Sequence, residues 1–255
     1  MSVKLPDTVC FRVTRGCNAR CSFCLAPPDG ITADGAALGR RLDWLLSHGV
    51  KTVHFCGGEP TLHPALPELL RQVHACGGKN RITTNAIELS QPVLSALRAT
   101  RTLTKVSLHG DRTYHNRMVG CDAFDLTVSN LRRLKAAGVT TSVQTTLVAD
   151  GTWVLDWIID FCLSNGIARL SILPFLPRGN GRDRREEYGF TLVQRSALRE
   201  LVKKKRRALG TRLDLRWLDL SAGRIHVVEL DGRILLEGPT EARDDLVCQI
   251  PTGHE

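Results

Sequence analysis

Short apolar segments rich in β-branched residues alternate along the chain with longer segments whose apolar residues recur every three or four positions. The first pattern predicts strands and the second predicts amphipathic helices. The expected strands are Thr8–Val13, Thr52–Cys56, Arg81–Thr83, Lys105–Leu108, Thr141–Leu147 and Arg169–Leu173. The expected helices are Ala33–Ser47, Ala65–Ala75, Pro92–Arg98, Phe124–Ala137, Trp153–Ser164 and Leu192–Ala208. Glycines after four of these helices indicate left-handed C-caps, at Gly49, Gly77, Gly138 and Gly166.

Six successive strand–helix units predict an α/β protein with a parallel sheet and right-handed crossovers. The alternation by itself does not separate an open sheet from a barrel. In both architectures the ligand site lies at the carboxyl ends of the strands. The unusual residues of this chain all follow strands, in the segments Cys17–Cys24, Gly57–Pro60, Thr84–Asn85, His109–Gly110 and Pro174–Phe175. We therefore expect them to share one rim of the sheet.

The segment from about Thr211 onward does not continue the alternation of strand and helix patterns. Arg224–Leu230 and Arg233–Leu236 flank Asp231–Gly232, which predicts a β-hairpin with a type I′ turn. We accordingly expect a core over residues 1–190. Residues 191–255 are expected to add a helix and a β-hairpin packed on that core.

Size and composition are those of a soluble globular chain of 255 residues, 42% hydrophobic and 24% charged. No apolar run reaches membrane-spanning length and the first residues lack an apolar signal region, so we expect a cytoplasmic protein with no membrane partner. Nine cysteines in that reducing compartment are expected to be ligands, catalytic groups or packed thiols. The net charge of +9 favours anionic partners. The low aromatic content of 5% and the lack of an appended RNA-binding module argue against nucleic acid.

The chemistry of the chain centres on three cysteines in a C-x3-C-x2-C spacing, Cys17, Cys21 and Cys24. Cysteine thiolates are the usual ligands of iron–sulfur clusters, and a cubane cluster normally takes four of them. Three ligands would leave one iron open for chemistry. Zinc held by these cysteines and a histidine such as His54 is the alternative.

With Phe23 before the last cysteine and Gly57–Gly58–Glu59–Pro60 after the second strand, the chain resembles the radical SAM superfamily. The resemblance covers most of residues 8–175. It implies a partial (β/α)6 TIM-like barrel, here with a short C-terminal β-containing extension. It also implies a single [4Fe–4S] cluster, because the tail has only Cys248 and cannot supply a further cluster by itself.

The resemblance assigns roles to particular residues. Cys17, Cys21 and Cys24 would bind three irons, and S-adenosylmethionine (SAM) would chelate the fourth. SAM contacts are expected from Phe23, Gly57, Gly58, Glu59, Thr84, Asn85, Ser107, Leu173 and Pro174. One electron, supplied by an external donor such as flavodoxin or ferredoxin, would cleave SAM to methionine and a 5′-deoxyadenosyl radical. That radical would abstract hydrogen from the substrate. Asn85 has a second interpretation as an Asx-turn residue.

Three further residues are candidates for catalysis. Cys248 and Cys121 are possible hydrogen-atom donors, as in family epimerases, and packing of each as a small apolar thiol is the alternative. His109 ends the fourth strand and would face the substrate or serve as a hydrogen-bonded structural histidine.

The main hypothesis is a radical SAM enzyme acting on a small anionic or phosphorylated substrate, such as a nucleotide or sugar phosphate, by dehydrogenation, epimerisation or rearrangement. Arg178 and Arg182, in a glycine-containing loop, are the expected phosphate contacts, because a guanidinium fork suits phosphate. Tyr114 lies in what we expect to be a loop after the fourth strand and is a third substrate candidate. Peptide modification, RNA modification and a non-catalytic iron–sulfur electron-transfer protein are the competing hypotheses.

Overall fold

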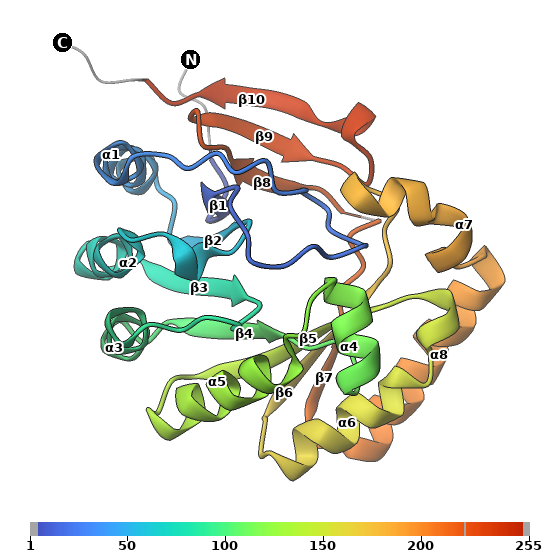
Figure 1. Cartoon of the computed structure of the whole chain (residues 1–255). Coiled ribbons are helices and arrows are strands. Elements are labelled where there is room, and N and C mark those ends of the chain that lie inside the picture. The colour runs from blue at the N-terminus through green and yellow to red at the C-terminus, as the bar shows by residue number, and fades with distance from the viewer. Residues whose placement is uncertain (1–4, 222, 252–255) are drawn as a thin grey trace.

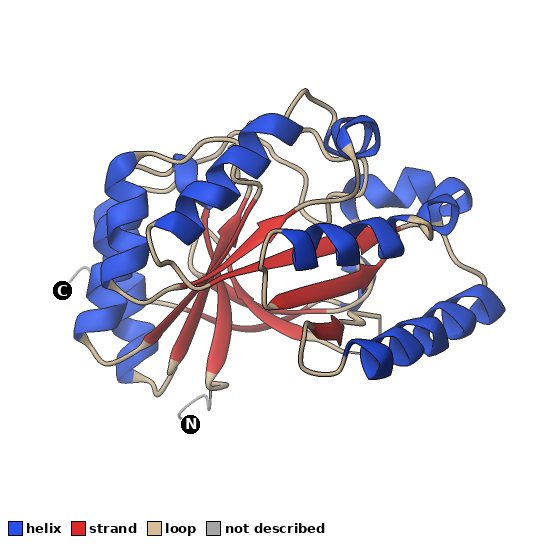
Figure 2. Cartoon of the chain, turned by 90° about the horizontal axis from the view of Figure 1, so that it is seen from below, coloured by secondary structure: helices blue, strands red, loops and turns tan. Residues whose placement is uncertain are grey.

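The computed structural model describes residues 5–221 and 223–251 and forms a curved α/β sheet with helices on its outer side (Figure 1, Figure 2). Its strands are β1 (Thr8–Thr14), β2 (Thr52–Gly57), β3 (Lys79–Thr84), β4 (Leu103–Ser107), β5 (Thr141–Leu147), β6 (Arg169–Pro174), β7 (Asp214–Trp217), β8 (Ile225–Val228), β9 (Arg233–Glu237) and β10 (Asp245–Gln249). Its α-helices are α1 (Gly35–Ser47), α2 (Leu66–Ala75), α3 (Gln91–Ala99), α4 (Arg112–Val119), α5 (Phe124–Ala136), α6 (Val154–Ser164), α7 (Arg185–Tyr188) and α8 (Leu192–Leu209). Short 3-10 helices are η1 (Pro60–Leu62), η2 (Ala149–Gly151), η3 (Gly179–Arg184) and η4 (Glu241–Arg243).

The strands pair in the order β10-β9-β8-β1-β2-β3-β4-β5-β6-β7. All neighbours from β1 to β7 are parallel, and β8 is parallel to β1, whereas β9 and β10 continue antiparallel. Helices between the strands lie outside the curve (Figure 2), so the predicted parallel sheet and partial TIM-like barrel are confirmed. Because β1 to β6 are parallel, their carboxyl ends open at a single rim.

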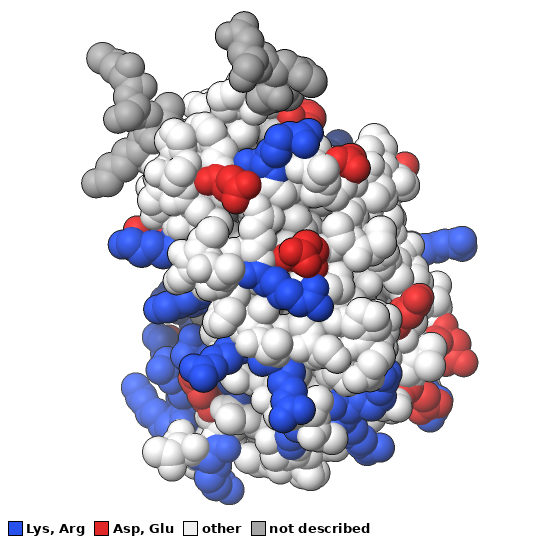
Figure 3. Space-filling model, turned by 90° about the vertical axis from the view of Figure 1, so that its left-hand side faces the viewer, with Lys and Arg blue, Asp and Glu red and all other residues white. Residues whose placement is uncertain are grey.

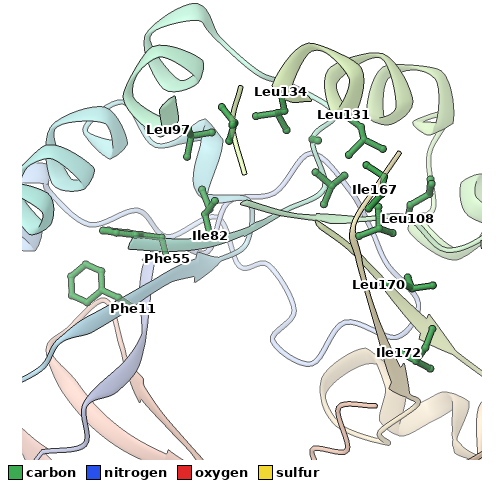
Figure 4. Packing of buried hydrophobic residues seen from close by; sticks show 14 of the residues in the cluster. Phe11, Phe55, Ile82, Leu97, Leu108, Leu131, Leu134, Ile167, Leu170 and Ile172 are labelled. Atoms are coloured by element: carbon green, nitrogen blue, oxygen red, sulfur yellow. The ribbon is translucent and has the colours of Figure 1, made fainter. Parts of the chain in front are cut away.

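Alternate strand residues point to opposite faces of the sheet, and one set packs under the helices. Phe11, Phe55 and Ile82 from three neighbouring strands are fully buried there. Figure 4 shows that Leu97 and Leu134, from α3 and α5, occupy the same layer. Side chains at the intervening strand positions therefore face the inside of the curve. This division decides which strand residues can reach a substrate.

The sequence pattern located the first six strands and their helices to within two residues. The expected left-handed caps are confirmed, since Gly49, Gly77, Gly138 and Gly166 have φ of +91°, +76°, +75° and +59°.

The segment around Tyr114 differs from the prediction. It is helix α4 rather than a loop, because Asp111 caps its N-terminus through a bond from Tyr114 N and Gly120 ends it at φ +72°.

The hairpin of β8 and β9 is present, but its turn is not type I′. That turn would need positive φ at two successive central residues. In residues 229–232 only Gly232 has positive φ, +90°, and its N–H donates to the carbonyl of Glu229 at 3.0 Å. The connection is therefore a four-residue turn closed by a left-handed glycine.

The tail adds strands to both edges of the sheet. Helix α8 leads into β7, which pairs with β6, and β8 pairs with β1 at the opposite edge. Strands β7 and β10 were not predicted. Strand β7 alternates charged and apolar residues but has only four residues, and β10 is short and has no clear alternation. Within the described residues, no helix is long and apolar enough to cross a membrane.

Candidate active site

The loop after β1 carries the three cysteines and is fastened to α4 and to the segment after β6 (the blue loop in Figure 1). The N–H groups of Arg20 and Ser22 donate to carbonyls at the end of α4, at 2.8 and 3.1 Å. Asn180 holds the other side: its N–H donates to the Cys24 carbonyl at 2.9 Å and its Nδ2 to the Cys21 carbonyl at 3.0 Å. The loop is thus fixed through its backbone groups.

The glycine pair after β2 lies directly against the start of the cysteine loop. The N–H of Gly58 donates to the Thr14 carbonyl at 2.7 Å, and the N–H of Glu59 donates to the Gly16 carbonyl at 2.8 Å. Gly57 has φ +139°, and a Cβ there would lie 2.2 Å from the Thr14 oxygen; one at Gly58 would lie 2.1 Å from the Gly16 oxygen. Both positions therefore require glycine, and the two motifs expected at one rim are in contact.

Glu59 is buried at the centre of a hydrogen-bond network. Its Oε1 accepts bonds from Thr61 N, Thr61 Oγ1 and Thr84 Oγ1 at 3.0, 2.7 and 2.6 Å, and its Oε2 accepts one from Asn85 N at 2.7 Å. Burial raises the pKa of Glu59, and these donors oppose that shift. The carboxylate therefore positions the Thr84–Asn85 turn at the end of β3.

Asn85 links this turn to the cysteine loop. Its Oδ1 accepts from Ile87 N at 2.9 Å, which is an Asx-turn, and its Nδ2 donates to Asn18 Oδ1 at 2.8 Å. The side chain is thus engaged locally, as the second interpretation of this residue proposed.

The three thiols form a suitable donor set for an iron–sulfur cluster. Burial raises the pKa of Cys17, Cys21 and Cys24, and for Cys21 the neighbouring thiols of Cys24 and Cys17 raise it further. Such buried thiols become thiolates only beside positive charge, which iron supplies. In residues 5–221 and 223–251, no group of three or more Cys, His, Asp or Glu side chains already has metal-binding geometry.

His54, the histidine of the zinc alternative, belongs to a different part of the molecule. It lies on β2, where its Nε2 is hydrogen-bonded to Thr83 Oγ1 of β3 at 2.8 Å. This arrangement gives no support to a zinc site with the cysteine loop.

The remaining predicted SAM contacts lie at the ends of neighbouring strands. Ser107 is the last residue of β4, opposite Gln144, and Leu173 and Pro174 end β6 opposite Thr146 and Leu147. They share the rim with the cysteine loop, and their contact with SAM stays a prediction.

His109 packs against Phe23 of the cysteine loop. Its ring lies edge-on to Phe23, with centroids 4.7 Å apart, and its Nδ1 accepts a bond from Thr146 N at 3.2 Å. Burial lowers the pKa of His109 well below its usual value, with a smaller effect from His115. A neutral, buried imidazole packed under Phe23 favours the structural interpretation of this residue.

The structure separates the two cysteines considered as hydrogen donors. Cys121 lies beside the cysteine loop, where its thiol donates to the Asn18 carbonyl at 3.8 Å and packs near Cys17 and Cys21. Cys248 on β10 pairs with Ile234 of β9. Ile234 pairs in turn with Val228 of β8, and Val228 pairs with Phe11 of β1, so all four residues lie in one row across the sheet. That register gives it the helix-facing side of the sheet, where it packs against the core. This position favours the packing interpretation of Cys248, and the donor role of either cysteine stays a prediction.

The predicted substrate residues after β6 are engaged within the protein. Arg178 is buried and donates to both carboxylate oxygens of Asp244 at 2.8 and 2.7 Å, with Glu237 at 3.2 Å. Arg182 pairs with Glu241 at 2.9 Å. These guanidinium groups fasten the C-terminal strands to the barrel, and their charge is already matched.

Tyr114 lies inside α4 and points toward η2. A Cβ on Gly151 would meet its hydroxyl at 1.9 Å, and its ring packs edge-on against Trp153, with centroids 5.3 Å apart. Burial raises the pKa of Tyr114 to about 12. This setting is one of packing between helices.

Replacing Glu59 with glutamine should weaken SAM binding about tenfold while most of the iron is retained. An amide offers one acceptor oxygen for two separate sets of donors, so its NH2 group would face either Asn85 N–H or the threonine hydroxyls. Charge-assisted bonds of this kind contribute about 1.5–3 kcal/mol, and ten-fold in affinity is about 1.4 kcal/mol. Calorimetric SAM titration measures the effect, with Glu88→Gln, at an exposed side chain of the same segment, as the matched control. Equal SAM affinity in the two variants would remove Glu59 from the site.

Comparison with known proteins agrees with this geometry. The sequence profile of the radical SAM superfamily matches residues 11–156, more than half of the chain. A GTP 3′,8-cyclase from Chlorobaculum tepidum is 33% identical over 151 residues, covering 57% of this chain and 46% of that protein. An Fe-coproporphyrin III synthase from Methanosarcina barkeri is 28% identical over 182 residues, covering 68% of this chain and 45% of that protein. The chain spans about half the length of these curated relatives.

The fold is similar to that of a solved peptide-bound protein. The crystal structure of Streptococcus suis SuiB bound to its precursor peptide SuiA matches with a TM-score of 0.78 over 91% of this chain and 59% of SuiB. Sequence identity in that match is 18%, so it establishes the fold alone.

Proposed function

The chain belongs to the radical SAM superfamily, whose enzymes use a [4Fe–4S] cluster and SAM, and from this premise we propose that it modifies a small anionic substrate by hydrogen abstraction. When bound, the cluster and SAM supply a 5′-deoxyadenosyl radical. The proposal includes an external one-electron donor, such as a flavodoxin or ferredoxin. Dehydrogenation, epimerisation and rearrangement are the outcomes open to the substrate.

The contact between the cysteine loop and the Gly57–Gly58 turn carries this proposal. Residues Cys17, Cys21 and Cys24 would hold the cluster, and the turn would receive the methionyl end of SAM next to it. Two backbones approach so closely at this point that a single Cβ at either glycine would collide with a carbonyl oxygen. Such a cradle has no purpose in an iron–sulfur protein that only transfers electrons.

The chain's own residues hold this site in place. Glu59 fixes the Thr84–Asn85 turn, Asn180 fixes the cysteine loop, and the ring of Phe23 lies over His109. Such preorganised backbone would orient the reacting groups and exclude water from the radical. Cys121, beside the loop, is the candidate hydrogen donor to a substrate radical.

Charge supports an anionic substrate. The chain has a net charge of +9, which favours anionic partners. Figure 3 shows the outer side that carries α1, α2 and α3, where lysine and arginine side chains gather in the lower half; the rim with the cysteine loop is a different face. The name of the Chlorobaculum relative states that it acts on GTP, which is itself anionic.

The test is anaerobic reconstitution with iron and sulfide, followed by dithionite and SAM. We expect about four irons per chain and formation of 5′-deoxyadenosine. SAM-binding calorimetry on the same sample is the second measurement. A protein that holds the cluster but neither binds nor cleaves SAM would refute the proposal.

A further inference from the structure

The inner face of the curved sheet is unusually basic. Four cationic side chains occupy inward strand positions: Arg81 of β3, Lys105 of β4, Arg169 of β6 and Arg216 of β7. Their strand neighbours Ile82, Val106, Leu170 and Leu215 are fully buried on the opposite face, under the helices. Arg81 and Arg216 are exposed, and Lys105 and Arg169 are half-buried, so these cations line a cavity that solvent reaches.

These four side chains line one cavity of about 220 Å³. His54 of β2 completes its wall, and Ser142 and Ser171 contribute hydroxyl groups from β5 and β6. The register places the central residues side by side, with Lys105 opposite Ser142 and Ser171 opposite Arg216. Six consecutive strands, from β2 to β7, therefore present hydrogen-bond donors or cations to one space.

The positive charge of the cavity is only partly matched. Asp214 is shared by Arg169 and Arg216, at 2.8 Å from each. In the described part of the chain, neither Lys105 nor Arg81 has a carboxylate within ion-pair distance. Burial lowers the pKa of Lys105, and the charge of Arg81 lowers it further. Lys105 therefore lies in the positive field of Arg81, Arg216 and Arg169, and an added anion would offset the part of that repulsion that solvent does not already screen.

We propose that this cavity is a binding site for a phosphate-type oxyanion, held by Lys105, Arg81 and Arg216 with hydroxyl donors from Ser142 and Ser171. The inference deepens the proposed function and rests on it where the anion is the phosphate end of the substrate. The fork-shaped donors of arginine and the ammonium of lysine are the groups that proteins use for phosphate.

The cavity is large enough for one end of a substrate but not for the whole substrate molecule. At about 30 Å³ per water the cavity holds roughly seven waters, which accommodates a phosphate or diphosphate group. Pockets that enclose an entire drug-sized ligand measure about 300–1,000 Å³. Lys105 is two residues below Ser107 at the rim, or roughly 7 Å at 3.3 Å per residue. A substrate with its phosphate here would direct its carbon skeleton toward the rim.

A free oxyanion is the second source of the same chemistry. Arg81 and Leu103 also line a pocket of about 380 Å³ among the residues that begin β3 and β4. An inorganic anion would use the cationic donors of the cavity alone, whereas a substrate phosphate would bind there with its organic part extending toward the rim.

The experiment is calorimetric titration of the reconstituted enzyme with sodium diphosphate, sodium tripolyphosphate and GTP. Lys105→Met and Arg81→Gln remove one charge each from the cavity. Lys204→Met removes the same charge from an exposed position on α8 and is the matched control. We expect each cavity variant to weaken diphosphate binding at least tenfold and the control to stay within twofold of wild type. Thermal melting verifies that the variants are folded.

The titration with GTP distinguishes a substrate phosphate from a free oxyanion as the natural ligand of the cavity. Binding of GTP at least tenfold tighter than tripolyphosphate, and dependent on Lys105, assigns the cavity to the phosphate end of an organic substrate. Equal affinity for the two assigns it to a free oxyanion.

Two results would overturn the site: no binding of any of the three anions by wild type, or equal losses in Lys105→Met and Lys204→Met. Formation of 5′-deoxyadenosine is measured on the same wild-type sample. Anion binding by a protein that neither binds nor cleaves SAM would refute the proposed function and leave the site. SAM cleavage without anion binding would refute the anion site and leave the proposed function.

Discussion

Replacing Cys24 with alanine is expected to abolish cluster binding and SAM cleavage together. The variant leaves two sulfur ligands of the motif, and a cubane cluster held by two thiolates is not retained. The fold should persist, because the loop is fastened through backbone groups, including the Cys24 carbonyl that accepts from Asn180. Iron content, visible absorbance and 5′-deoxyadenosine are the measurements. All three should fall to background with little change in melting temperature.

Cys76→Ala is the control, because it removes an exposed thiol at the end of α2. Cys121 provides a further test, since it packs near Cys17 and Cys21 and is a possible replacement ligand. If Cys24→Ala retains iron, the double variant with Cys121→Ala should lose it. Retention of iron and SAM cleavage in that double variant would show that Cys24 is not a ligand.

The sequence was sufficient to predict the rim because the signals there are local. A cysteine spacing, a glycine pair and short apolar strands each depend on neighbouring residues, and parallel strands bring their ends together. The observed contact between Gly58 and Thr14 follows from that topology. Helix α4 carried local signals too, in Asp111 and Gly120, but its sequence has few apolar residues to mark a buried face.

The ion-pair partners of charged residues could not be predicted from the sequence, because long-range packing determines which side chains meet. Arg178 lies in a loop that looks free in the sequence, but its partner Asp244 is 66 residues away. The loop arginines Arg178 and Arg182 are paired with carboxylates, whereas Lys105 and Arg81 lie on strands and have no such partner among the described residues.

One sequence signal would have found the inner cavity. In β3, β4 and β7 a basic residue stands next to a buried aliphatic one, as Arg81–Ile82, Lys105–Val106 and Leu215–Arg216. A period of two with cations on one face is unexpected for a sheet covered by helices, where both faces are usually apolar. Together, these strands predict a polar inner face of the sheet.

Replacing Gly58 with alanine should disrupt SAM binding more severely than any single loss of a hydrogen bond in the site. The new Cβ would stand 2.1 Å from the Gly16 oxygen and 2.6 Å from its carbonyl carbon. Neither atom belongs to a flexible side chain, so the turn must move away from β1 and break the bonds from Gly58 and Glu59. Overpacking of this kind costs about 1–3 kcal/mol. We expect SAM affinity to fall by at least about tenfold, since each 1.4 kcal/mol is a factor of ten.

Gly223→Ala is the matched control, because a Cβ at that position would have no heavy atom within 4 Å. SAM affinity by calorimetry and unfolding by denaturant are measured for both variants. The collision is at the backbone of Gly16, directly before Cys17, so some loss of iron is also expected in Gly58→Ala. Because the Glu59→Gln substitution leaves this backbone contact intact, it should lower SAM affinity with less loss of iron. A Gly58→Ala protein that bound SAM as tightly as the control would show that the cradle does not hold SAM.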